Sequence, residues 1–111
     1  MLNFREELNE IKKEQEKKRK LQEHLDIFFS DFLETLRETD LLSINSLVFE
    51  RGNAMICVGL PEDNKIYFFE KHYGDDSEYF TKELFYKIAC KLESEGFLLE
   101  KKETSFIITL D

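Results

Sequence analysis

The first 37 residues contain neither glycine nor proline, and apolar side chains recur among them every three or four positions. This spacing places them on one side of an α-helix, so we expect one helix over about residues 2–37. At 1.5 Å per residue it is about 54 Å long, more than the diameter of a small domain, and part of it must project. Its apolar residues form two groups: Phe4, Leu8 and Ile11, then Leu21, Leu25, Phe28, Phe29, Phe32, Leu33 and Leu36.

Between the two groups lies a run, residues 12–20, that has no apolar side chain. Continuing the three-four spacing through it puts Gln15, Lys18 and Gln22 on the apolar side, where polar residues weaken a coiled coil without ending the helix. A second copy of this helix is therefore the first candidate partner for Phe4, Leu8 and Ile11, and a different protein is the next.

The same run carries a basic patch, which has two interpretations: a contact for nucleic-acid phosphates or a solvated helix face. Two glutamates, Glu14 and Glu16, interrupt the patch, and it has no aromatic side chain to stack on bases. We favour solvation. The patch consists of Lys12, Lys13, Lys17, Lys18, Arg19 and Lys20.

After residue 40 the pattern changes to short runs rich in β-branched and aromatic residues. Runs at 44–50, 54–60 and 65–73, separated by the turn sequences RGN and PEDN, predict a three-stranded antiparallel meander, with Gly52 where a positive φ is needed. Residues 77–95 predict a second amphipathic helix that stops at Gly96, and 97–111 a closing hairpin. We expect one α+β domain over residues 1–111, ordered α-β-β-β-α-β-β, with 1–24 as a projecting helical segment.

Aromatic residues are numerous, with eleven Phe and four Tyr. In the third strand, alternation puts Tyr67 and Phe69 on one face and Phe68 on the other, so both faces of the sheet are partly apolar. Either the first helix covers the face that the second leaves open, or the sheet meets another chain. We predict a partner-binding set: Phe4, Leu8, Ile11, Tyr67 and Phe69.

Charge is distributed unevenly along the chain, whose formal net charge is −8. Residues 25–111 hold nine Lys or Arg and eighteen Asp or Glu, and such an acidic body repels nucleic acid and attracts basic surfaces. An acidic cluster, Asp75, Asp76 and Glu78, precedes the second helix. We interpret it as capping that helix, and a metal or acid-base role is the weaker alternative.

Motifs for catalysis or cofactor binding are absent from the sequence: it has no Walker, G-x-S-x-G or G-x-G-x-x-G pattern, and its four His and Cys residues lack zinc spacing. We expect no enzyme activity, cofactor or metal, and buried, reduced thiols at Cys57 and Cys90. No apolar run approaches the roughly 20 residues that span a bilayer, and the N-terminus lacks a signal-peptide pattern, so we expect a cytoplasmic protein.

Two loose resemblances bear on function. Residues 84–110, LFYKIACKLESEGFLLEKKETSFIITL, resemble the helix-plus-wing end of winged-helix regulators, which implies DNA binding, although no helix-turn-helix precedes them. The order of elements resembles the core of type III secretion chaperones, which dimerise and hold an unfolded effector segment, although that family's final helix is absent.

The expected function is a non-catalytic protein-binding module, a small acidic adaptor or inhibitor, whose carboxylates can mimic nucleic-acid phosphates. Its partner is a second copy or a larger basic protein. The disfavoured alternative is a nucleic-acid-binding accessory protein that uses the basic patch or the winged-helix-like half.

Overall fold

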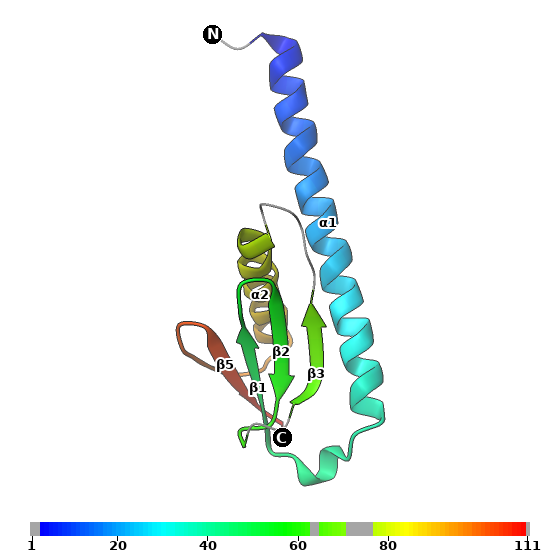
Figure 1. Ribbon diagram of the computed structural model, residues 1–111, viewed down its shortest axis with the longest axis vertical. Coiled ribbons are helices and arrows are strands. Elements are labelled where there is room, and N and C mark those ends of the chain that lie inside the picture. Colours follow the sequence, from blue (N-terminus) through cyan, green and yellow to red (C-terminus); the bar gives the residue numbers. More distant parts are fainter. Residues whose placement is uncertain (1–2, 63–64, 71–76, 111) are drawn as a thin grey trace.

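A computed structural model of the protein describes residues 3–62, 65–70 and 77–110. It contains helix α1 (Phe4–Arg37), a 3₁₀ turn η1 (Leu41–Ser43), strands β1 (Ser46–Arg51), β2 (Met55–Gly59) and β3 (Lys65–Glu70), helix α2 (Ser77–Ser94), and strands β4 (Leu99–Lys101) and β5 (Ser105–Thr109) (Figure 1). The predicted α+β class and order of elements are confirmed.

Helix α1 begins at a cap that the sequence supplies. The side-chain oxygen of Asn3 accepts a hydrogen bond from the backbone N–H of Glu6 at 2.9 Å, which satisfies one of the free donors of the first turn. Glu6 and Glu7 lie in that turn, where negative charge is favoured by the helix dipole. The helix then runs for 34 residues, and its N-terminal turns rise beyond the other elements (Figure 1). The molecule is accordingly elongated, measuring 59 × 28 × 26 Å.

The five strands form one antiparallel sheet in the order β3-β2-β1-β5-β4. The predicted meander supplies β3, β2 and β1, and β5 pairs with the free edge of β1, opposite β2. Because β5 is a central strand, the β4–β5 hairpin is an integral part of the sheet rather than a projecting wing. The resemblance to a winged-helix protein therefore does not extend to the tertiary structure.

Both helices pack on the same face of this sheet. In α1, the ring of Phe28 lies 5.3 Å from Tyr67 and 5.7 Å from Phe69, measured between ring centroids. In α2, the ring of Phe85 lies 5.0 Å from Phe106, which stacks on Phe49 at 4.7 Å. Rings from both helices and three strands thus meet in one core.

The alternative in which α1 covers the face left open by α2 is therefore wrong. Five strands spaced about 4.8 Å apart make a sheet roughly 19 Å wide, and two helices packed 8–10 Å apart fit side by side on one face. Neither helix of the described residues covers the opposite face of the sheet.

Helix α2 ends as predicted, because Gly96 adopts a left-handed conformation with φ of 96°. Among the described glycines it alone has a positive φ, so the expectation of one at Gly52 is wrong. The backbone N–H of Gly52 donates instead to the carbonyl of Met55 at 2.8 Å, which closes the β1–β2 turn.

Candidate functional site

The N-terminal part of α1, residues 4–22, is called the stem here because it lies beyond the body formed by the rest of the chain (Figure 1). Its first three apolar residues are exposed: Phe4 keeps 75% of its surface, Leu8 40% and Ile11 47%. We call these three residues the stem stripe. Packing on the body begins near the end of the stem at Leu21, which is half-buried, and continues at His24, whose ring meets Phe80 of α2 at 5.2 Å, and at the buried Leu25.

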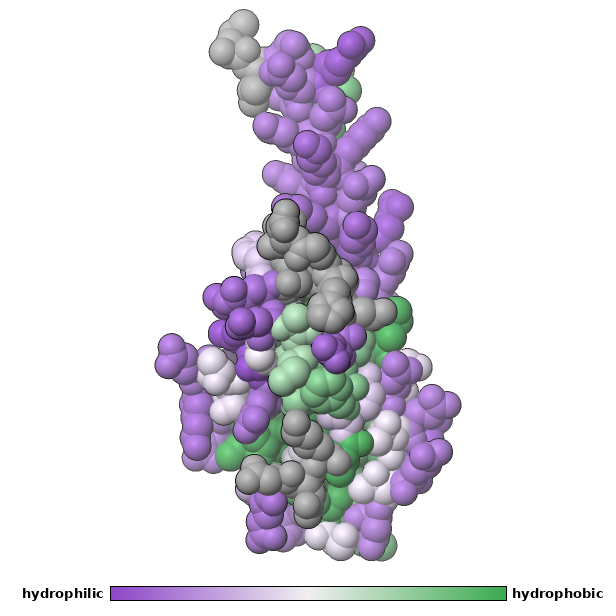
Figure 2. Space-filling view, viewed as in Figure 1, coloured by the Kyte–Doolittle hydropathy of each residue, from purple (hydrophilic) through white to green (hydrophobic). Residues whose placement is uncertain are grey.

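The six residues of the predicted basic patch all lie on the stem, and all are exposed. The ion pairs found within the described ranges are Lys82–Glu78, Lys91–Glu95 and Lys101–Glu93, so none of them uses the patch. In the view of Figure 2 the stem presents an almost entirely hydrophilic surface. The ammonium and guanidinium groups of the patch are therefore open to solvent.

Two residues of the predicted partner-binding set belong to the core instead. Phe69 is 7% exposed and Tyr67 is half-buried, and both contact Phe28 of α1. The prediction that Tyr67 and Phe69 bind a partner needs correction, since α1 covers the face of β3 that carries them. Only the stem stripe remains accessible.

The sheet face without a helix carries apolar residues that sequence reasoning did not select. Phe68 is 44% exposed and Met55 37% exposed, and Cys57, the partner of Phe68 in the strand register, is buried. Alternation along β3 did place Phe68 opposite Phe69. The sequence held no signal for which of the two faces α1 would cover, because both are apolar.

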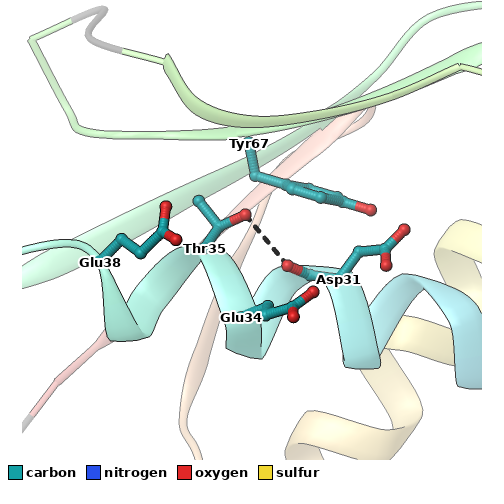
Figure 3. Close-up of a pocket in the computed structure, with 5 residues that line it drawn as sticks. All are labelled: Asp31, Glu34, Thr35, Glu38 and Tyr67. Atoms are coloured by element: carbon teal, nitrogen blue, oxygen red, sulfur yellow. Dashed lines mark hydrogen bonds between the residues drawn. The ribbon is translucent and has the colours of Figure 1, made fainter.

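A shallow, open pocket of about 270 Å³ lies between α1 and β3, lined by Asp31, Glu34, Thr35, Glu38 and Tyr67 (Figure 3). The α1 residues share one side of the helix because they are three or four positions apart. The Thr35 hydroxyl is engaged locally, donating to the backbone carbonyl of Asp31 at 3.0 Å. Three carboxylates beside one phenol make a site that suits a basic side chain.

The pocket alters the acidity of Tyr67. Burial, followed by the charge of Asp31 and a hydrogen bond with it, raises the pKa of Tyr67 from 10.0 to about 12. The phenol therefore stays protonated and able to donate a hydrogen bond at every physiological pH. The spacing of Asp31, Glu34 and Glu38 was visible in the sequence, but nothing there indicated that Tyr67 would lie beside them.

The predicted acidic cluster is only partly within the described residues. Asp75 and Asp76 lie outside them, so their predicted role in capping α2 stays a prediction. Glu78 is in the first turn of α2 and pairs with Lys82 at 3.5 Å. Residues 3–62, 65–70 and 77–110 hold no group of three or more His, Cys, Asp or Glu side chains that could bind a metal ion.

Both cysteines are free thiols, but only one is buried as predicted. Cys57 is buried, whereas Cys90 is half-buried on α2.

Comparison with known proteins adds no relative: no family model, curated protein or solved structure matches this chain. In the described part of the chain, no helix is long and apolar enough to cross a membrane.

Proposed function

We propose that this protein is a non-catalytic protein-binding module that uses its stem to contact another polypeptide. The observation that carries the proposal is the exposed stem stripe on a helix that leaves the body. Solvent contact with Phe4, Leu8 and Ile11 is unfavourable, at about 25 cal/mol for each Å² of apolar surface that a partner would bury. Most helical stability in proteins comes from packing of the apolar side, which the stem stripe lacks within this chain, so a partner would stabilise the helix as well.

The acidic body supports a second contact in the same function. The pocket formed by Asp31, Glu38 and Tyr67 offers carboxylates and a phenol to a lysine or arginine side chain. A formal charge of −9 over residues 25–111 attracts basic surfaces at long range and repels nucleic acid. A basic protein that normally holds nucleic acid fits this chemistry, and the carboxylates then act as phosphate mimics.

The second candidate function is nucleic-acid binding through the stem, favoured by the solvent exposure of all six basic residues there. It requires an affinity that falls steeply with salt, because each phosphate contact releases counterions. Gel-shift titration with duplex and single-stranded DNA at two salt concentrations tests it. Loss of a salt-sensitive complex in a variant with Lys17, Lys18, Arg19 and Lys20 replaced by Gln would favour this function over ours.

Site-specific photo-crosslinking in the native host tests the proposed function. A photoreactive phenylalanine analogue replaces Leu8 in one variant and Lys13, on the opposite side of the stem, in the matched control. We expect protein adducts from position 8 and few from position 13. Equal or absent adducts at the two positions would refute the proposed function, whatever the identity of the partner.

A further inference from the structure

We propose that the partner of the stem is a second copy of this chain, with the two stems forming a parallel, in-register, two-stranded coiled coil. The inference rests on the proposed function, since it names the partner of the same exposed stripe. It is carried by the arrangement of charges on either side of that stripe.

The stem has the periodicity of a coiled coil over its whole length. Starting from the stem stripe, the side that bears it continues with spacings of four and three residues, which is a repeat of 3.5. The positions are Phe4, Leu8, Ile11, Gln15, Lys18 and Gln22. In heptad notation, residues 8, 15 and 22 are a positions, and residues 4, 11 and 18 are d positions.

The flanking positions of this heptad are strictly divided by charge. The e positions are Arg5, Lys12 and Arg19, all basic, whereas the g positions within residues 4–18 are Glu7 and Glu14, both acidic. All five side chains are exposed on the stem. The arrangement therefore has one basic and one acidic border along the stripe.

This division of charge selects the orientation of the two stems. In a parallel pair, a g residue lies beside the e residue five positions later in the partner, so Glu7 meets Lys12 and Glu14 meets Arg19 of the second copy. By symmetry each contact occurs twice, giving four attractive pairs. An antiparallel pair brings e beside e and g beside g, so like charges face each other on both borders.

The polar residues that continue the line of the stem stripe, Gln15 and Lys18, set the strength of the pairing. In register, the side-chain amides of Gln15 meet across the interface and can hydrogen-bond, while two Lys18 ammonium groups repel each other. Buried polar residues at such positions fix register at a cost in stability. The dimer is therefore expected to be reversible, with its mass depending on protein concentration.

The body leaves space for a second stem beside residues 4–20, all of which are exposed. Phe80 of α2 meets α1 at His24, and Leu21 is the first residue of α1 that packs against the core. Farther along, Leu33 lies within about 20° of Phe4 around the axis at about 100° per residue, and it is still 51% exposed. Phe29 on the same side packs against the core, with Lys91 of α2 over its ring at 5.4 Å, so the second copy would pair with the stem and not with the rest of α1.

Charge reversal in the purified full-length chain tests the pairing. The variants Glu7→Lys/Glu14→Lys and Lys12→Glu/Arg19→Glu each place like charges at all four contacts, and sedimentation equilibrium should show each dimer weakened at least tenfold. Mixing the two restores attraction at all four contacts and should restore a dimer. The matched controls Glu10→Lys/Glu16→Lys and Lys13→Glu/Lys20→Glu make the same charge changes on the outer side and should leave the dimer within about twofold of wild type.

Disulfide trapping tests the orientation in a chain with Cys57→Ala and Cys90→Ser. Leu8→Cys brings two thiols together only in a parallel, in-register pair, and we expect it to crosslink to completion under mild oxidation. Crosslinking only between a Leu8→Cys chain and an Ile11→Cys chain would show an antiparallel pair and overturn the inference. A wild-type chain that remains a monomer at all accessible concentrations would also overturn it. If position 8 still crosslinks to another protein in the host, the proposed function survives that result.

Discussion

The two ends of helix α1 have the same apolar spacing and opposite surroundings. From Leu25 to Leu36 the apolar side faces α2 and the sheet, and Phe28 and Phe32 are almost fully buried. From Phe4 to Gln22 the same spacing continues, but every side chain except that of Leu21 is exposed. Periodicity therefore decides which side of a helix is apolar, and only tertiary structure decides whether the same chain covers it.

The two ends also differ in charge. The stem carries seven basic and five acidic side chains, and those that flank its stripe are divided by sign, whereas the body carries an excess of acid. A body with that excess repels its own copy, and the stem offers pairs of opposite charge that counteract the repulsion. The contrast is consistent with the two proposed contacts, self-association through the stem and a basic partner for the body.

The largest expected effect separates the stability of the body from that of the stem. Phe49 is fully buried and stacks on Phe106, and Phe49→Ala should lower the free energy of unfolding by about 3–5 kcal/mol through lost transfer energy and a cavity. Phe4→Ala, at a side chain 75% exposed, should lower that of the monomer by less than about 0.5 kcal/mol. Urea unfolding followed by circular dichroism at low protein concentration measures both.

Comparable losses in these two variants would contradict the division into body and stem. They would mean that Phe4 contributes to the same cooperative unit as Phe49.

The fold was largely predictable because each element has a strong local signal. The absence of glycine and proline in residues 4–37, the alternation in residues 46–51 and Gly96 after α2 fixed the elements and their order. The sheet face chosen by α1 was not predictable, since Tyr67 and Phe68 are aromatic neighbours that favour either face equally. That choice depends on contacts between residues distant in sequence, which local patterns do not encode.

The candidate site, like the fold, was predictable only in part. The stem stripe was identified correctly as exposed, because no body of this size can cover both ends of a helix about 51 Å long. The pocket beside Tyr67 was missed, because it requires α1 and β3 to be adjacent. The sequence thus indicated the stem stripe, which depends on one helix. It did not indicate the pocket, which depends on the contact between α1 and β3.

The second prediction compares the two faces of β3 within the body. Phe69 packs on Phe28 and is 7% exposed, so Phe69→Ala should lower the free energy of unfolding by about 3 kcal/mol. Phe68 on the other face is 44% exposed, and Phe68→Ala should cost less than about 1 kcal/mol. The midpoint of urea unfolding, at an unchanged m-value, gives both. A larger loss for Phe68 would mean that the open face is covered in solution.

The third prediction sharpens the role of the stem. Lys18 occupies a d position between Gln15 and Gln22, and Lys18→Leu removes a repulsion and adds apolar surface to the proposed interface. The dimer should tighten about tenfold, or about 1.4 kcal/mol, as measured by sedimentation equilibrium. Lys17→Leu, one residue away on the outer side, is the control and should leave the dimer unchanged. Equal effects of the two substitutions would indicate nonspecific association.

The smallest effect concerns the pocket where α1 meets the body. With its pKa raised to about 12, Tyr67 should ionise well above the pH range of an ordinary tyrosine side chain. The near-ultraviolet phenolate absorbance of wild type minus that of Tyr67→Phe isolates its titration. Asp31→Asn should shift this titration downward without restoring the ordinary pKa, because burial is the larger cause.

The same shift has a consequence for stability. The unfolded chain releases the Tyr67 proton near pH 10 and the folded chain near 12, so the folded state holds more protons between these values. The contribution of Tyr67 to the free energy of unfolding is therefore complete below pH 10 and is lost as the pH rises towards 12. Glu34→Gln removes a carboxylate from the same pocket that does not contribute to the shift, and it should leave the titration unchanged. A full return to pH 10 in Asp31→Asn would mean that α1 does not bury Tyr67, and that the body begins farther along the helix.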